Sequence, residues 1–215
     1  VFNDAQNLLK SIIKNDRLDA KAVYGFFRAQ SRDEDIELFE EGLSFYFPRQ
    51  LMDKGSHPNF SLADYISPSG DDYIGIFAVT AGHGIQNIIK EYQSKNDDYN
   101  EIMVKVLADR LAEAAAEWLH MKVRTKYWGY SKKEEFNLND MLYEKYIGIR
   151  PAPGYPACPD HKEKDKIWKL LQVEKEIGIS LTESRAMFPA ASVCGWYFSH
   201  PKARYFSVLK NNRLQ

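Results

Sequence analysis

Apolar residues recur at helical spacing through the first fifteen residues of the chain, with polar and charged residues between them. The apolar positions are Phe2, Leu8, Leu9, Ile12 and Ile13. Such a pattern places them on one face of an amphipathic helix. We therefore expect a helix over residues 1–15.

Three short, aromatic-rich segments follow, at residues 22–30, 36–39 and 43–47, and charges or glycine separate them. This pattern is typical of antiparallel strands joined by tight turns. Residues 73–80, Tyr-Ile-Gly-Ile-Phe-Ala-Val-Thr, are almost continuously apolar. A strand of that composition is expected to be buried on both faces of its sheet.

The longest helix is expected over residues 97–127. Its apolar positions recur every three or four residues: Met103, Leu107, Leu111, Ala114, Trp118 and Met121. They predict one buried stripe. Further along, Asp160 and Glu163 have the spacing of a capping box and predict the start of another helix, which Gly178 is placed to end.

Residues 193–198 and 204–209 predict two strands of a hairpin that turns at Ser199-His200-Pro201-Lys202. Helices are thus inserted among strands that lie close together in the sequence. The pattern favours an α+β fold with a largely antiparallel sheet flanked by helices. Because the chain has no internal repeat, low-complexity tract or clear linker, we expect residues 1–215 to form one domain.

Composition excludes several classes of protein. The formal net charge of the 215 residues is -1, which argues against nucleic acid as a partner. No apolar run approaches the roughly 20 residues that span a bilayer, so no membrane partner is expected. With only Cys158 and Cys194, neither a disulfide framework nor a thiolate zinc site is expected. We expect a cytoplasmic protein, and the start at Val1 instead of methionine predicts an N-terminally truncated domain.

The most distinctive segment is Arg-Pro-Ala-Pro-Gly-Tyr-Pro-Ala-Cys-Pro-Asp-His at residues 150–161, where four of the chain's nine prolines fall within nine residues. Prolines stiffen the chain, so this segment loses less entropy on ordering than an ordinary loop. It also keeps an arginine, a tyrosine, a thiol and a histidine. Two interpretations stay open: a loop built to hold a ligand, or a rigid connector between a strand and a helix.

Other chemistry finds less support. The glycine pair of Gly82-His83-Gly84 falls short of a dinucleotide fingerprint. No histidine pair has the spacing of a metal-binding helix, so no metal site is expected. Cys158 with His161 or His200 could form a nucleophile and base, which leaves a cysteine enzyme as a lesser alternative.

Several charged and aromatic residues have both a structural and a functional interpretation. Asp109 and Glu113 are four residues apart on the long predicted helix, where like charges repel. A solvated helix face explains them, unless the fold brings a cationic ligand group to Glu113. Glu144 presents the same choice. Tyr205 and Phe206, beside the predicted turn, either pack in the core or face a ligand.

Residues 150–161 resemble the signature of the activation domain of cobalamin-dependent methionine synthase. Further stretches are similar as well: residues 77–80, 103–105, 108–114, 127–130, 181–184 and 195–201. The match covers most of the chain and is closest from about residue 70 onward. The resemblance implies a single domain with a bent antiparallel sheet and flanking helices.

The resemblance also implies a function in methionine biosynthesis. The domain would bind S-adenosylmethionine and dock on the cobalamin-binding domain of the same polypeptide, where cobalamin oxidised to cob(II)alamin is reductively methylated. The electron would come from a flavodoxin-type donor. The whole enzyme would be the methyltransferase that acts on 5-methyltetrahydrofolate and homocysteine, and its cobalamin and zinc would belong to modules absent from this chain.

Residue by residue, the resemblance assigns the ligand carboxylate to Arg150, whose planar fork suits it. Gly154 would allow close approach of the backbone, and Ala152 and Tyr155 would line the adenosine side with main-chain groups. Two carboxylates would face the positive end of the ligand, and two aromatic residues would close the site: Glu113, Glu144, Tyr205 and Phe206. No catalytic acid or base is implied.

The resemblance places Asp109 and His161 toward the cobalamin domain. Two departures from the family pattern bear on the site. An aspartate that the family uses upstream of the first helix is expected to precede Val1, and residues 83–85 lack the acidic residues of some relatives. A protein-interaction module that has lost its ligand therefore remains the alternative.

Overall fold

The computed structural model describes residues 1–51, 55, 58–135 and 137–208, in two compact units. The first unit consists of Val1–Val23, Ala78–Leu119 and Val173–Val193. The second consists of Tyr24–Phe77, His120–Gln172 and the chain from Cys194 onward. Four long elements contribute residues to both units: β1 (Asp19–Arg32), β4 (Asp72–His83), α3 (Asp98–Lys122) and β7 (Ser192–Tyr197).

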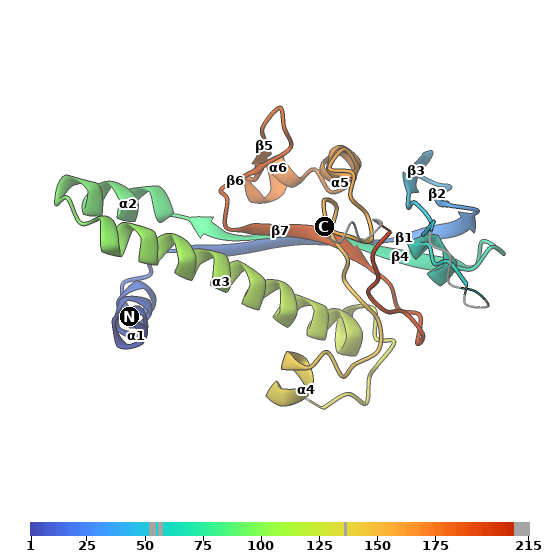
Figure 1. Cartoon of the computed structure of the whole chain (residues 1–215), viewed down its shortest axis with the longest axis horizontal. Coiled ribbons are helices and arrows are strands. Elements are labelled where there is room, and N and C mark those ends of the chain that lie inside the picture. The colour runs from blue at the N-terminus through green and yellow to red at the C-terminus, as the bar shows by residue number, and fades with distance from the viewer. Residues whose placement is uncertain (52–54, 56–57, 136, 209–215) are drawn as a thin grey trace. The chain divides into compact units, whose positions relative to one another are not determined.

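The first unit is mainly helical. Besides its part of α3, it holds α1 (Phe2–Lys14), α2 (Ile85–Ser94), α6 (Val173–Ile177) and the short antiparallel pair β5 (Ser180–Leu181) and β6 (Met187–Phe188). α1 and α2 are seen near the N-terminal half of α3 in Figure 1. Their buried core draws on Ile12 of α1, Ile88 of α2 and Val104 of α3. The predicted helix over residues 1–15 is confirmed.

The predicted buried stripe of α3 is confirmed in part, since Met103 and Met121 are buried and Leu107 and Leu111 pack partly buried against the core. Val104, Ala108, Ala112 and Ala116 are fully or almost fully buried, whereas Ala114 is exposed and Trp118 is 52% exposed. Small residues four positions apart let a helix approach its neighbours closely, and this row fills the buried face in place of Ala114 and Trp118. The helix itself is as long as predicted, because a π-helical turn, η2 (Val123–Tyr127), follows α3.

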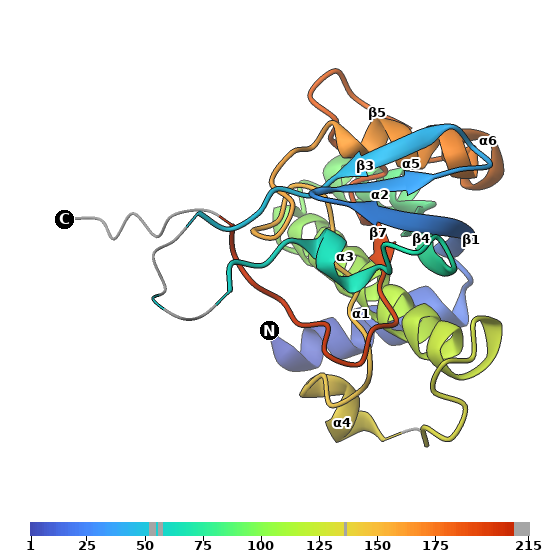
Figure 2. The same cartoon turned by 90° about the vertical axis from the view of Figure 1, so that its right-hand side faces the viewer.

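The described residues form a five-stranded sheet in the order β3-β2-β1-β4-β7. In the second unit, β1 pairs antiparallel with β2 (Asp35–Leu38), and β2 with β3 (Leu43–Tyr46), as Figure 2 shows. These strands confirm the three predicted aromatic segments. β4 is buried at every residue from Ile74 to Gly82, which confirms a strand covered on both faces. The α+β prediction is therefore confirmed.

An aromatic cluster forms the centre of the second unit. The Trp196 ring meets those of Phe45 and Phe47 edge-on at 5.5 and 4.9 Å, and Phe47 meets Phe198 at 5.9 Å. All four rings are fully buried. α5 (Glu163–Leu171) lies against β3 beside this cluster, and the short helices η1 (Leu62–Tyr65) and α4 (Leu138–Leu142) complete the unit.

The helix predicted between Asp160 and Gly178 is in fact two. Asp160 does not cap it: its carboxylate accepts a hydrogen bond from the Lys162 backbone, and Lys162 occupies the N-cap without a side-chain bond. Gln172 has a φ of 48° and separates α5 from α6. Gly178, at φ 68°, ends α6 as predicted.

The predicted hairpin is wrong, although its first strand is confirmed as β7. Residues 203–208 form no strand, and Leu209 lies outside the described residues. Ile149 pairs with Phe198, and Pro151 accepts a hydrogen bond from the Trp196 backbone. The segment 149–151 therefore occupies the edge of β7 with which the predicted second strand would have paired. Within the described ranges, no helix has both the length and the apolar character of a membrane span.

Candidate functional site

The proline-rich loop folds into a tight turn whose tip is exposed. The Gly154 N–H donates to the Cys158 carbonyl at 2.8 Å, and the Cys158 N–H donates to the Tyr155 carbonyl at 2.9 Å. Pro151, Pro153 and Ala157 are buried beneath it. Gly154 and Tyr155 therefore form an exposed tip whose main chain is held by hydrogen bonds within the turn.

Gly154 cannot be replaced without disturbing this turn. Its φ is 91°, and a Cβ added there would collide with the imidazole of His161. His161 itself is exposed. The structure thus brings Gly154 and His161, both singled out in the sequence, into contact. The positive φ and the close approach of the His161 ring both require glycine at this position.

Arg150 stands at the start of the loop and is partly buried. Its Nη1 donates to the Tyr146 hydroxyl at 2.9 Å, and its backbone N–H donates to the Tyr205 hydroxyl at 3.1 Å. Tyr205 comes from a segment 55 residues later, so the fold unites two predicted site residues. Phe206 packs elsewhere, against Phe60 and Tyr65 at 6.0 and 6.5 Å, and its expected contact with a ligand stays a prediction.

Glu144 precedes this arginine by six residues, just after α4. Its side chain is exposed and its φ is 51°. A left-handed conformation costs a residue other than glycine roughly 1–2 kcal/mol. The Glu144 N–H donates to the Met141 carbonyl at 3.2 Å, which holds this turn in place.

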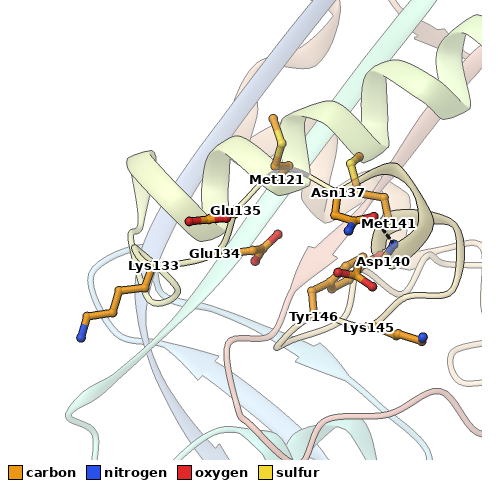
Figure 3. Close-up of a pocket in the computed structure, with 9 residues that line it drawn as sticks. All are labelled: Met121, Lys133, Glu134, Glu135, Asn137, Asp140, Met141, Lys145 and Tyr146. Atoms are coloured by element: carbon orange, nitrogen blue, oxygen red, sulfur yellow. Dashed lines mark hydrogen bonds between the residues drawn. The ribbon is translucent and has the colours of Figure 1, made fainter.

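A pocket of about 400 Å³ lies beside these residues, between the end of α3, α4 and the segments around them (Figure 3). Its lining consists of Met121, Lys133, Glu134, Glu135, Asn137, Asp140, Met141, Lys145 and Tyr146. Lys133 and Lys145 point away from its centre in Figure 3. Asn137 accepts hydrogen bonds from the backbone of Asn139 and Asp140 and so begins α4. No motif in the sequence marks this pocket, so the sequence did not predict it.

Two fully buried side chains, Arg124 and His120, contact the Tyr146 ring. The Arg124 guanidinium carbon lies 3.7 Å from the ring centroid, and its Nε and Nη2 bind the Glu134 carboxylate at 2.8 and 2.6 Å. The His120 ring meets Tyr146 edge-on at 5.3 Å. Burial, with the charges of Arg124 and Arg150, holds the pKa of His120 well below its usual range, so it is neutral.

Asp109 and Glu113 lie in the first unit, both exposed on α3. They line one cleft of about 330 Å³, together with Arg110, Ser192 and Val193. The structure therefore places these two predicted residues side by side at the start of β7. The remaining predicted residues belong to the second unit.

Comparison with known proteins identifies the family. All of residues 1–215 match the family model described as the activation domain of vitamin B12-dependent methionine synthase. The chain belongs to this family. A solved relative, the MetH reactivation domain bound to AdoHcy, is 47% identical, superposes with a TM-score of 0.91, and is matched over 96% of the present chain. The match covers 66% of the relative, so this chain spans about two thirds of its length.

The family and the α+β fold expected from the resemblance are thus confirmed, and the match crosses both compact units of this activation domain. That residues 1–215 form one domain stays a prediction. The roles assigned to individual site residues stay predictions as well.

The cysteines of this activation domain are poorly suited to nucleophilic chemistry. Burial, together with the nearby carboxylates of Glu163 and Asp160, raises the pKa of the Cys158 thiol to about 12. Burial also raises the pKa of the Cys194 thiol to about 12. Both are therefore protonated thiols at neutral pH. Among the described residues, no group of three or more His, Cys, Asp or Glu side chains could hold a metal ion.

Proposed function

We propose that this activation domain binds S-adenosylmethionine, and its demethylated product S-adenosylhomocysteine, at Arg150 and the loop tip. The observation that carries the proposal is Arg150 at the start of a stiff loop with an exposed tip, its backbone N–H bonded to the Tyr205 hydroxyl. The AdoHcy in the solved relative supports the same choice of ligand.

The residues present fit the chemistry of this ligand, which has a carboxylate, an ammonium group, a positive or neutral sulfur and an aromatic base. Arg150 offers a planar fork for the carboxylate. Gly154 sets the left-handed turn at the loop tip, and the main chain of Ala152 and Tyr155 on this turn is proposed to meet the adenosine.

The remaining proposed contacts involve charge and aromatic surface. Glu144 is an exposed carboxylate close to Arg150 in sequence and suits the α-amino group or the sulfonium. Glu113 is proposed for the same end of the ligand. Tyr205 and Phe206 would close the site with aromatic surface, which also attracts a sulfonium.

We further propose that the domain docks on the cobalamin-binding domain of the same polypeptide, with Asp109 and His161 facing it. There, one electron from a flavodoxin-type donor and the electrophilic methyl group of S-adenosylmethionine reductively methylate cob(II)alamin and leave S-adenosylhomocysteine. The chain's own residues would act by holding the methyl donor in an orientation that lets the two reactants meet, which lowers the entropic barrier.

The parent enzyme is proposed to be the cytoplasmic methyltransferase that converts homocysteine to methionine with 5-methyltetrahydrofolate. Its cobalamin and zinc would be held by its other modules.

Calorimetric titration tests the ligand proposal. We expect S-adenosylhomocysteine to bind the native domain, and Arg150→Ala to weaken binding by about 100-fold, since a charge-assisted pair to a carboxylate is lost. Arg32→Ala is the matched control, because Arg32 is an exposed arginine of the same unit paired with Glu37. Equal binding by native and Arg150→Ala proteins would refute the assignment.

Reactivation is tested in the full-length enzyme. With Arg150→Ala, we expect normal initial turnover from methylated cobalamin, followed by loss of activity that S-adenosylmethionine and reductant do not restore. If the isolated domain bound neither ligand yet still bound the cobalamin domain, the interaction-module alternative would replace the proposal.

A further inference from the structure

Tyr146 lies between two guanidinium groups in the second unit. Its hydroxyl accepts a hydrogen bond from Arg150 Nη1 at 2.9 Å, and its ring face meets the Arg124 guanidinium at 3.7 Å. Tyr146 therefore connects a partly exposed arginine to one that is fully buried.

We propose that Tyr146 is a positioning residue that aims the Arg150 guanidinium at the carboxylate of the bound ligand. The inference rests on the proposed function, in which Arg150 holds that carboxylate. An arginine side chain loses rotamer entropy when it pairs with a ligand, so a fixed partner at its tip favours the conformation that pairs bidentately.

The Tyr146 ring is itself held from two sides. Arg124 on its face is 0% exposed and is anchored by two-pronged hydrogen bonding to Glu134, so it has little freedom to move. His120 meets the ring edge-on at 5.3 Å and is stacked on Tyr197 at 5.0 Å. Cation–π and edge-to-face contacts of these kinds fix the plane of an aromatic ring.

The charges of this cluster are compatible with an incoming carboxylate. Glu134 compensates Arg124, and His120 is uncharged at neutral pH, with a hydrogen bond of 3.2 Å between its Nε2 and the Tyr130 hydroxyl. Tyr146 is a neutral acceptor, so it orients Arg150 without supplying a competing negative charge. A carboxylate in its place would pair with Arg150 directly.

The test is Tyr146→Phe, which keeps the ring against Arg124 and His120 and removes only the hydroxyl. Binding of S-adenosylhomocysteine is compared with that of 5′-methylthioadenosine, which carries the same adenosine and thioether without the amino-acid part. We expect about tenfold weaker binding of S-adenosylhomocysteine and unchanged binding of methylthioadenosine. Tyr143→Phe is the matched control, since Tyr143 is a neighbouring tyrosine that is 72% exposed.

Each other outcome overturns the inference. If Tyr146→Phe weakened both ligands equally, the hydroxyl would be structural. If it weakened neither while Arg150→Ala lost S-adenosylhomocysteine, the proposed function would stand and the role of Tyr146 would be wrong. If Arg150→Ala also bound S-adenosylhomocysteine normally, the proposed site and the inference would both fail. Thermal unfolding of each variant establishes that the fold is retained.

Discussion

Two glycines set the path of the proline-rich loop, each for a different physical reason. Gly195 of β7 leaves room for the Pro151 carbonyl, which a Cβ would strike, and the Trp196 N–H can then bond to that carbonyl at 3.0 Å. Gly154 combines a left-handed φ with contact to the His161 ring. The loop is therefore hydrogen-bonded to β7 at its start, and its tip is packed against the His161 ring.

Replacing Gly154 with alanine should destabilise the domain through both effects. We expect Gly154→Ala to lower the free energy of unfolding by about 1–3 kcal/mol, because a left-handed residue is strained and its Cβ has no room. Gly42→Ala is the control: its φ is 59°, but nothing lies within 4 Å of an added Cβ. Urea denaturation measures both, and equal losses would show that the His161 contact contributes nothing.

The resemblance to the family identified the residues of the proline-rich loop, but not the residues that pack against them. Arg150, Gly154 and His161 belong to one contiguous segment with a recognisable sequence. Tyr146 and His120 carry no local signal, because an isolated tyrosine or a histidine on an apolar helix face is common. Their importance comes from tertiary contacts with Arg124 and Tyr197, which no spacing in the sequence encodes.

Among the smaller elements, η1 shows how a short helix is held in the second unit. Ser61 and Asp64 form a reciprocal capping box, and the Asp64 carboxylate also accepts two hydrogen bonds from Arg49, each at 2.7 Å. Burial raises the pKa of Asp64, but the bonds from Arg49 and the Ser61 N–H outweigh it, so the pKa lies below its usual value. The charged carboxylate therefore stabilises this element.

Asp64→Asn should reveal that contribution as a function of pH. An unfolded aspartate has a pKa of about 3.9, and a lower value in the folded state means that the stabilisation is present above pH 4 and is lost as the pH falls through the folded pKa. We expect Asp64→Asn to cost about 1 kcal/mol at pH 7 and less as the pH drops below 4.

Guanidinium denaturation between pH 2.5 and 7 measures this difference. Asp71→Asn is the control, since Asp71 pairs with Arg28 but its side chain is 81% exposed. Such surface pairs contribute little. A gap between native and Asp64→Asn proteins that stayed constant down to pH 2.5 would contradict the role of the charge.

The elements that the sequence predicted correctly are those with strong local patterns. β4 was recognised from its continuous apolar run, and α1 from its spacing. The errors have tertiary causes. Trp118 is exposed because alanines take the buried face of α3, and residues 204–208 form no strand because Ile149–Pro151 occupies the edge of β7. Competition for a sheet edge cannot be read from either segment alone.

At the scale of the whole molecule, the two compact units share their longest elements. β1, β4, β7 and α3 each pass from one unit into the other. Unfolding of one unit would therefore cut the hydrogen-bonded ladders and the helix on which the other depends. Domains joined by separate linkers lack this constraint, and often unfold independently.

We therefore expect a single cooperative thermal transition, with a calorimetric enthalpy equal to the van't Hoff enthalpy and near 150 kcal/mol, from about 0.7 kcal/mol per residue. A matched pair of core substitutions tests this. Ile88→Val lies in the first unit and Ile36→Val in the second, and both side chains are at most 1% exposed. Each should cost about 1 kcal/mol and move the same transition by about 2–4 °C. Two transitions, with Ile88→Val moving one and Ile36→Val the other, would show that the shared strands do not couple the units.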